Sequence, residues 1–192
     1  MSDESDEADA AILKGLTVEL NKRRAKRAQS TPGIDADGNL VDRNRGLLAF
    51  IRYFWDVLEP ETHLVEGWAM DAICQHLEAV TLGKITRLLI NVPPGFQKSL
   101  ITQVWHPAWE WGPMNMPHLR YVTFSYSSGL TMRDNVKFRT LVSSQKYREL
   151  WGDRFEVEKE GEIRITNDKQ GFKFASSVGG IGTGERGDRI IL

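Results

Sequence analysis

The sequence predicts one α/β domain preceded by a tail. In two successive stretches, residues 88–109 and 121–142, an apolar strand pattern is followed by helical spacing of apolar residues. Near the C-terminus, apolar residues alternate and predict further strands. Strands that alternate with helices are typical of a partly parallel sheet flanked by helices. The 192 residues, 41% of them hydrophobic, are enough for one sizeable core.

Composition excludes several classes of protein. The single cysteine, Cys74, excludes a disulfide framework and fits a reducing compartment. No apolar run approaches the roughly 18 residues of a membrane helix, and the acidic start lacks the features of a secretion signal. We therefore expect a soluble intracellular protein without membrane contact. With 25 basic and 26 acidic residues, any contact with nucleic acid must come from a local patch.

The first 40 residues are expected to lie outside the compact domain, which spans residues 41–192. Residues 1–10 are acidic with few apolar side chains, which predicts a disordered tail. Residues 11–28 have the spacing of a short amphipathic helix, with basic residues at its C-terminal end. Residues 30–39 contain the turn signals of a linker.

Two helices are predicted before the first strand. Apolar residues recur at helical intervals over residues 47–58 and again over 68–80, where Pro60 and Gly83 follow as stop signals. The short apolar run of residues 88–92 then predicts a strand.

A tight loop and a helix follow this strand directly. Residues 93–95 are Pro-Pro-Gly, and helical spacing resumes at Ser99 and continues to Trp109. Pro107 lies inside this helix and should kink or shorten it, because proline has no backbone N–H.

The second half begins with another strand and helix and ends in alternating segments. Residues 121–125 predict a strand, and Ser127 or Ser128 is expected to cap a helix that runs to Val142. A small antiparallel insert is predicted from three alternating apolar pairs: Phe155/Val157, Ile163/Ile165 and Phe172/Phe174. Residues 189–192 begin a further strand.

Residues 93–99, Pro-Pro-Gly-Phe-Gln-Lys-Ser, lie where a phosphate-binding loop must lie, between the end of a strand and the start of a helix. Backbone N–H groups and the helix dipole converge on an anion at such a position. Lys98 would pair with the β and γ phosphates, and the Ser99 hydroxyl would bind Mg²⁺. The remaining residues expected to surround the nucleotide are Pro94, Gly95, Phe96 and Gln97.

The match to the standard pattern G-x-x-x-x-G-K-[ST] is incomplete. Its two glycine positions fall on Val92 and Gln97, and the loop's glycine is Gly95. A left-handed conformation at Gln97 would cost about 1 kcal/mol through its Cβ. The alternative interpretation is an ordinary turn followed by a lone Lys-Ser pair. A second glycine pattern, residues 182–187, precedes a strand and not a helix, so we reject it as a dinucleotide fingerprint.

Several segments match one family in order and spacing over residues 45–192. They are Gly67-Trp68, Asp71-Ala72-Ile73, His76-Leu77-Glu78-Ala79-Val80, Leu89-Ile90-Asn91-Val92-Pro93-Pro94, Lys98-Ser99-Leu100, Trp105-His106-Pro107-Ala108-Trp109-Glu110-Trp111, Ser125-Tyr126-Ser127, Ser176-Ser177-Val178-Gly179-Gly180, Thr183-Gly184 and Gly187-Asp188-Arg189-Ile190-Ile191. In these segments the chain resembles the N-terminal ATPase part of a phage terminase large subunit. The resemblance implies a partial P-loop NTPase fold of the ASCE type, ATP and Mg²⁺ as cofactors, and ATP hydrolysis that drives DNA packaging into procapsids.

The resemblance also implies further site residues and partners. Trp68 is the candidate to hold adenine, with core packing as the alternative. Arg186 is the candidate arginine that stabilises transition-state charge at a neighbouring subunit's site, with a solvated loop residue as the alternative. Arg133 and Lys137 could contact DNA phosphates, although charged pairs on a helix face are usually solvated. The implied partners are double-stranded DNA, the small terminase subunit, the portal protein and further copies in a ring, all in the host cell cytoplasm.

Residues 189–192 resemble the strand of the Walker B motif, whose acidic residues would follow Leu192. Without them we expect weak nucleotide binding and negligible hydrolysis, and the family's nuclease domain is also expected to be absent. In this class, the strand between the Walker A and Walker B strands comes later in the chain, so a gap in the sheet is expected. The alternative functions are another helicase-like P-loop ATPase and a non-catalytic interaction module with a vestigial nucleotide site.

Overall fold

The computed structural model describes residues 46–177 and 184–192. The expected tail, helix and linker of residues 1–40 lie outside the described residues. In chain order the elements are α2 (Gly46–Leu58), α3 (Trp68–Thr81), α4 (Lys98–Leu100), the π-helical turn η1 (Ile101–Trp105), α5 (His106–Trp111), β1 (Arg120–Ser125), α6 (Ser128–Ser143), α7 (Gln145–Trp151), β2 (Val157–Glu160), β3 (Arg164–Asn167), β4 (Phe172–Ser177) and β5 (Arg189–Ile191).

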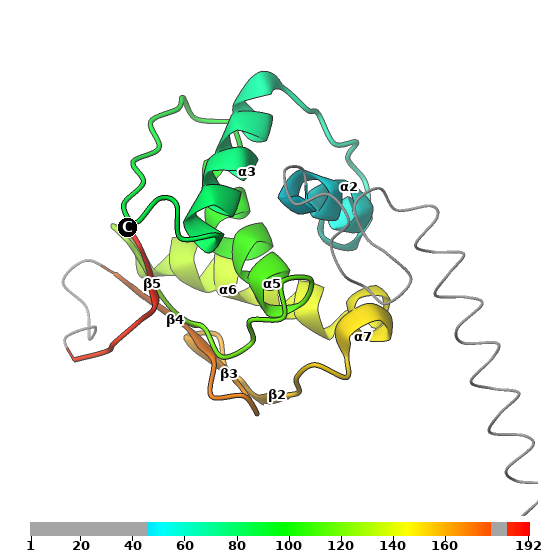
Figure 1. Ribbon diagram of the computed structural model, residues 1–192, viewed down its shortest axis with the longest axis vertical. Coiled ribbons are helices and arrows are strands. Elements are labelled where there is room, and N and C mark those ends of the chain that lie inside the picture. Colours follow the sequence, from blue (N-terminus) through cyan, green and yellow to red (C-terminus); the bar gives the residue numbers. More distant parts are fainter. Residues whose placement is uncertain (1–45, 178–183) are drawn as a thin grey trace, which may run out of the picture.

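The described strands form one five-stranded mixed sheet in the order β2-β3-β4-β1-β5. Strand β1 pairs in parallel with β4 and with β5, whereas β3 pairs antiparallel with β2 and β4. The labelled helices lie on one side of this sheet, and α6 packs against β1 and β4 (Figure 1). The predicted α/β class is therefore confirmed. The predicted antiparallel insert is present, but it continues the main sheet because its last strand, β4, is also the parallel neighbour of β1.

Aromatic side chains from three helices form the centre of the core. Phe50 of α2 lies with its ring 6.1 Å from that of Trp105 and 5.8 Å from that of Trp151. Tyr147 packs edge-on to Trp151 at 5.0 Å. Such pairs contribute about 0.5–1.5 kcal/mol each beyond the apolar area that they bury. This packing explains α7, which was not predicted: it is a short helix whose Tyr147 and Trp151, one turn apart, are both fully buried.

The predicted strand at residues 88–92 is wrong. These residues have no ladder partner among the described strands. They keep a strand's alternation, because Leu88, Ile90 and Val92 pack against the core while Leu89 is 93% exposed. A strand exists only through hydrogen bonds to a neighbour, and residues 88–92 take part in no ladder of the described sheet. The five described strands are all paired in one continuous sheet, so the expected gap is not observed among them.

The helix that follows runs from Lys98 to Trp111 without a break, so Pro107 does not shorten it. Its middle turn is π-helical, and the His106 N–H donates to the Ile101 carbonyl. In an α-helical register the Pro107 ring would clash with the carbonyl of Gln103 and leave it without a donor. The wider turn lets the helix continue past the proline.

A lysine is buried between the sheet and α6. Lys173 of β4 is fully buried, donates from Nζ to Asn135 Oδ1, and lies 5.5 Å from the ring centroid of Phe138. Burial lowers the pKa of Lys173 to about 7, while the negative charge of Asp134 acts in the opposite direction.

Lys173→Met should remove a pH dependence of stability. Because the folded-state pKa of Lys173 is about 7 against an ordinary 10.5, the unfolded chain binds more protons between these values. Stability of the native chain should therefore rise with pH through this window. We expect the variant to gain about 1–3 kcal/mol relative to the native chain near neutral pH, and to lose that advantage toward the upper end of the window. Urea unfolding at several pH values measures this, and a difference independent of pH would contradict it.

Candidate functional site

The loop at residues 93–97 contains two residues with a positive φ angle. Gly95 has φ 92°, and Gln97 has φ 56° and ψ 18°, in the left-handed region. Gln97 therefore adopts the left-handed conformation whose cost was considered from the sequence. The Gln97 carbonyl accepts from the Ile101 N–H at 2.9 Å, which joins the loop to the first helical turn.

The two side chains expected to bind phosphate and metal face solvent. Lys98 and Ser99 are both exposed. Within residues 46–177 and 184–192, the Lys98 amine makes no ion pair and the Ser99 hydroxyl makes no hydrogen bond. Phe96 is 42% exposed, and the buried Gln97 Oε1 has no hydrogen-bond partner in the described part of the chain. Both reactive side chains are thus available to a ligand.

These residues fit a polyphosphate with its metal ion. The loop precedes a helix whose first N–H groups have no partner within the helix, and the Lys98 ammonium lies at the same end. A cluster of three or more His, Cys, Asp or Glu side chains suited to a metal is absent from the described residues. A Mg²⁺ ion at this position would therefore depend on nucleotide oxygens, water and the Ser99 hydroxyl, which is how Mg²⁺ is commonly held beside phosphates.

Trp68 does not pack in the core. It is 83% exposed at the first position of α3, so the core-packing alternative is wrong. No hydrogen bond or ring contact in the described part of the molecule joins Trp68 to residues 93–99. Its role in holding adenine stays a prediction.

Arg186 is exposed, and its neighbours on both sides are anchored. Glu185 pairs with Arg164 at 2.7 Å, and Asp188 accepts from the Arg120 side chain at 2.9 Å. Arg186 itself has no ion-pair partner within the described ranges, and its side chain is exposed to solvent between two ion-paired residues.

The two candidate DNA contacts on α6 are engaged with protein carboxylates. Arg133 pairs with Asp134 at 2.7 Å, and Lys137 pairs with Glu59. Their predicted contact with DNA phosphates would compete with these pairs.

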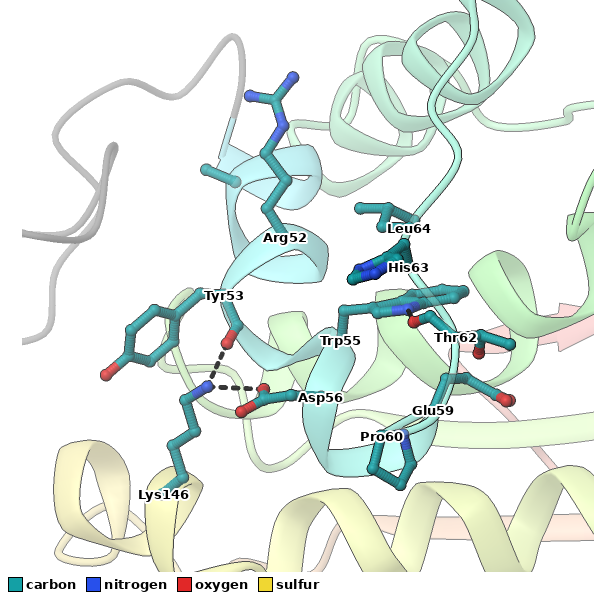
Figure 2. A pocket seen from close by; sticks show the side chains of 11 residues that line it. Arg52, Tyr53, Trp55, Asp56, Glu59, Pro60, Thr62, His63, Leu64 and Lys146 are labelled. Atoms are coloured by element: carbon teal, nitrogen blue, oxygen red, sulfur yellow. Dashed lines mark hydrogen bonds and ion pairs between the residues drawn. The ribbon is translucent and has the colours of Figure 1, made fainter.

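A cavity of about 540 Å³ lies elsewhere, along the outer side of α2 (Figure 2). The Trp55 indole Nε1 donates to the Thr62 carbonyl at 2.7 Å, and Lys146 donates to Asp56 at 2.7 Å and to the Tyr53 carbonyl. None of residues 93–99 lines the cavity. Sequence reasoning missed it, although polar residues at 52 and 56 mark the helix face opposite the buried one. Because the charges of Lys146 and Asp56 are paired with each other, the loop remains the candidate site.

Gln97→Gly should raise stability by about 0.5–1 kcal/mol, because glycine adopts the left-handed region without the Cβ penalty. Gln170→Gly is the matched control, since Gln170 has φ 67° in the turn between β3 and β4. Urea unfolding of both variants measures the effect. A loss of stability in Gln97→Gly alongside a gain in Gln170→Gly would contradict the left-handed loop.

The chain was compared with known proteins at three levels. Protein-family models, curated protein sequences and solved structures gave no match. Within residues 46–177 and 184–192, no helix combines the length and apolar character needed to cross a bilayer. Function is therefore inferred from the loop, its helix and the sequence resemblance.

Proposed function

We propose that residues 93–99 bind the phosphates of ATP with Mg²⁺, and that the chain is the ATPase portion of a phage terminase large subunit. The observation that carries this proposal is the left-handed Gln97, which directly precedes an exposed, unpaired Lys98 at the start of a helix. A Lys-Ser pair at such a junction is the arrangement that phosphate-binding loops use.

Each part of the loop has a role in binding. The Lys98 ammonium neutralises phosphate oxygens, and the N–H groups at the helix start donate to them. The Ser99 hydroxyl supplies one oxygen ligand to Mg²⁺. When bound, Mg²⁺ offsets the charge of the phosphates and orients them. In the motor that the resemblance implies, such binding would be coupled to movement of double-stranded DNA.

Backbone strain supports a ligand role for the loop. The described non-glycine residues with positive φ are Gln97, Asn115 and Gln170. Asn115 and Gln170 lie in turns between elements, where such conformations are common, whereas Gln97 directly precedes a helix. Left-handed conformations at non-glycine residues cost about 1–3 kcal/mol and cluster at ligand clamps.

The sheet contains parallel strands of the kind that such a site accompanies in other α/β folds. Strands β4, β1 and β5 are parallel, so their carboxyl ends lie at one edge of the sheet. Ligands of open α/β sheets bind at this edge. The terminase identity, the DNA, small-subunit and portal partners, the ring assembly and the role of Arg186 rest on the resemblance alone.

One observation favours the interaction-module alternative. Trp68 and Val65 are 83% and 79% exposed, and exposed aromatic residues are enriched at protein interfaces. This pair would contact a partner protein whether or not the loop binds nucleotide.

Thermal unfolding with and without a Mg-ATP analogue tests the proposal. A ligand at 100 times its dissociation constant stabilises the folded state by about 2.7 kcal/mol. We expect a rise in melting temperature for the native chain, its loss in Lys98→Ala, and its retention in Lys159→Ala. Lys159 is an exposed lysine on β2 and controls for the loss of one positive charge.

Two outcomes would contradict nucleotide binding at the loop. A shift that survives in Lys98→Ala would place the ligand elsewhere, for which the cavity beside α2 is the first place to examine. If the melting temperature of the native chain does not change, the interaction-module alternative is favoured.

A further inference from the structure

Four elements of the fold meet at one buried carboxylate, that of Glu110 in α5. Its side chain is fully buried. Arg189 of β5 donates from Nη2 to Glu110 Oε1 at 2.8 Å, and Thr81 of α3 donates to the same oxygen at 2.8 Å. The Tyr121 hydroxyl of β1 donates to Oε2.

A histidine completes this network. His106 Nε2 lies 2.9 Å from Thr81 Oγ1, and burial lowers the pKa of His106, which favours the neutral ring. A proton on Nε2 lets His106 donate to Thr81, whose own hydroxyl proton goes to Glu110. The carboxylate charge is then balanced by Arg189, and its oxygens accept several bonds. Glu110 is a fully satisfied buried charge.

A gain in stability alone poorly explains the buried ion pair of Glu110 and Arg189. Removing two charges from water costs several kcal/mol per ion, and well-packed apolar residues of similar volume commonly give equal or better stability. What a satisfied ionic network provides that apolar packing does not is a fixed relative position of the elements that it joins.

The helix that carries Glu110 also carries the loop. Lys98 begins this helix, Glu110 lies near its end, and the π-helical turn of η1 lies between them. Arg189 begins β5, which pairs with β1 over three residue pairs only. Glu110 therefore fixes both the helix behind the loop and a strand with little sheet pairing of its own.

We propose that Glu110 is a positioning residue, which holds the helix behind the phosphate loop in register with β5 through Arg189. A change in the loop then alters β5, and by linkage a change in β5 alters the loop. The link through Glu110 exists in the ligand-free chain and needs no nucleotide. Its extension, that nucleotide binding orders β5, rests on the proposed function.

Amide exchange in the ligand-free chain tests the link. The Ile101 amide, which donates to the Gln97 carbonyl, reports the junction of loop and helix. We expect Arg189→Met and Glu110→Gln to speed its exchange about tenfold through local opening. The amide signals of Gln97 and Lys98 should also move, although residue 189 belongs to a different element.

Two variants separate positioning from a general loss of stability. Asp134→Asn is the matched control, because Asp134 is a buried carboxylate on α6 that pairs with Arg133 and, among the described residues, makes no hydrogen bond or ion pair with the loop helix or β5. It should leave the Ile101 amide at the native rate. Arg189→Lys keeps the positive charge and should restore part of the protection. Equal effects in Asp134→Asn and Arg189→Met, or no effect at Ile101 in either Arg189→Met or Glu110→Gln, would overturn the inference.

Amide exchange in the presence of a Mg-ATP analogue separates the role of Glu110 from nucleotide binding itself. With a saturating Mg-ATP analogue, the Ile190 and Ile191 amides should exchange more slowly in the native chain. In Glu110→Gln, their exchange rates should be the same with and without the analogue. If the native chain does not bind the analogue, the proposed function fails while the ligand-free result still decides the role of Glu110. If both proteins bind and β5 is protected equally in both, the link through Glu110 is overturned.

Discussion

The fold depends on one helix that must be buried at one end and exposed at the other. Every residue from Ile101 to Trp111 is buried, whereas Lys98 and Ser99 face water. Helices α2, α3 and α6 pack around the buried part. Phe50 and Trp55 of α2 lie against Trp105, and Phe138 of α6 lies against Trp111. Because Pro107 disfavours a regular α-helical turn before it, the buried part of the helix begins with a π-helical turn, Ile101–Trp105. The loop is thus attached to a helix that is buried from Ile101 to its end.

Sequence patterns predicted the elements whose formation depends on local spacing. The apolar stripes of α2, α3 and α6 were sufficient, since a helix satisfies its own hydrogen bonds and needs only one apolar face. Residues 88–92 had an equally clear strand pattern, yet strands require a neighbour, and local sequence does not say whether one is present. Helix α7 is the opposite case, because it is present although the sequence did not predict it. Its few residues have little intrinsic helix stability, and burial of Tyr147 and Trp151 stabilises it.

The candidate site was also predictable only in part. The loop was predictable because Pro-Pro-Gly and Lys-Ser lie between a strand-like and a helical pattern. The left-handed conformation of Gln97 was not itself predicted, since the sequence showed only that Gln97 occupies a glycine position of the standard pattern. The Glu110 network was not predictable, because Thr81, Tyr121 and Arg189 meet it across separations of 29, 11 and 79 residues. The one local signal was a carboxylate between Trp109 and Trp111, which sequence alone does not distinguish from a solvated residue.

Two unfavourable features lie at opposite ends of this one helix. Gln97 holds a conformation that glycine would adopt without strain, and Glu110 holds a charge where an apolar residue would avoid desolvation. A helix selected only for stability would need neither. Strain at the loop is useful only if the loop is held in place, since a free helix end would relax it, and the ionic network behind the helix provides that restraint. The two features are therefore best understood together: the buried end of the helix is fixed so that its exposed end presents Lys98 in one geometry.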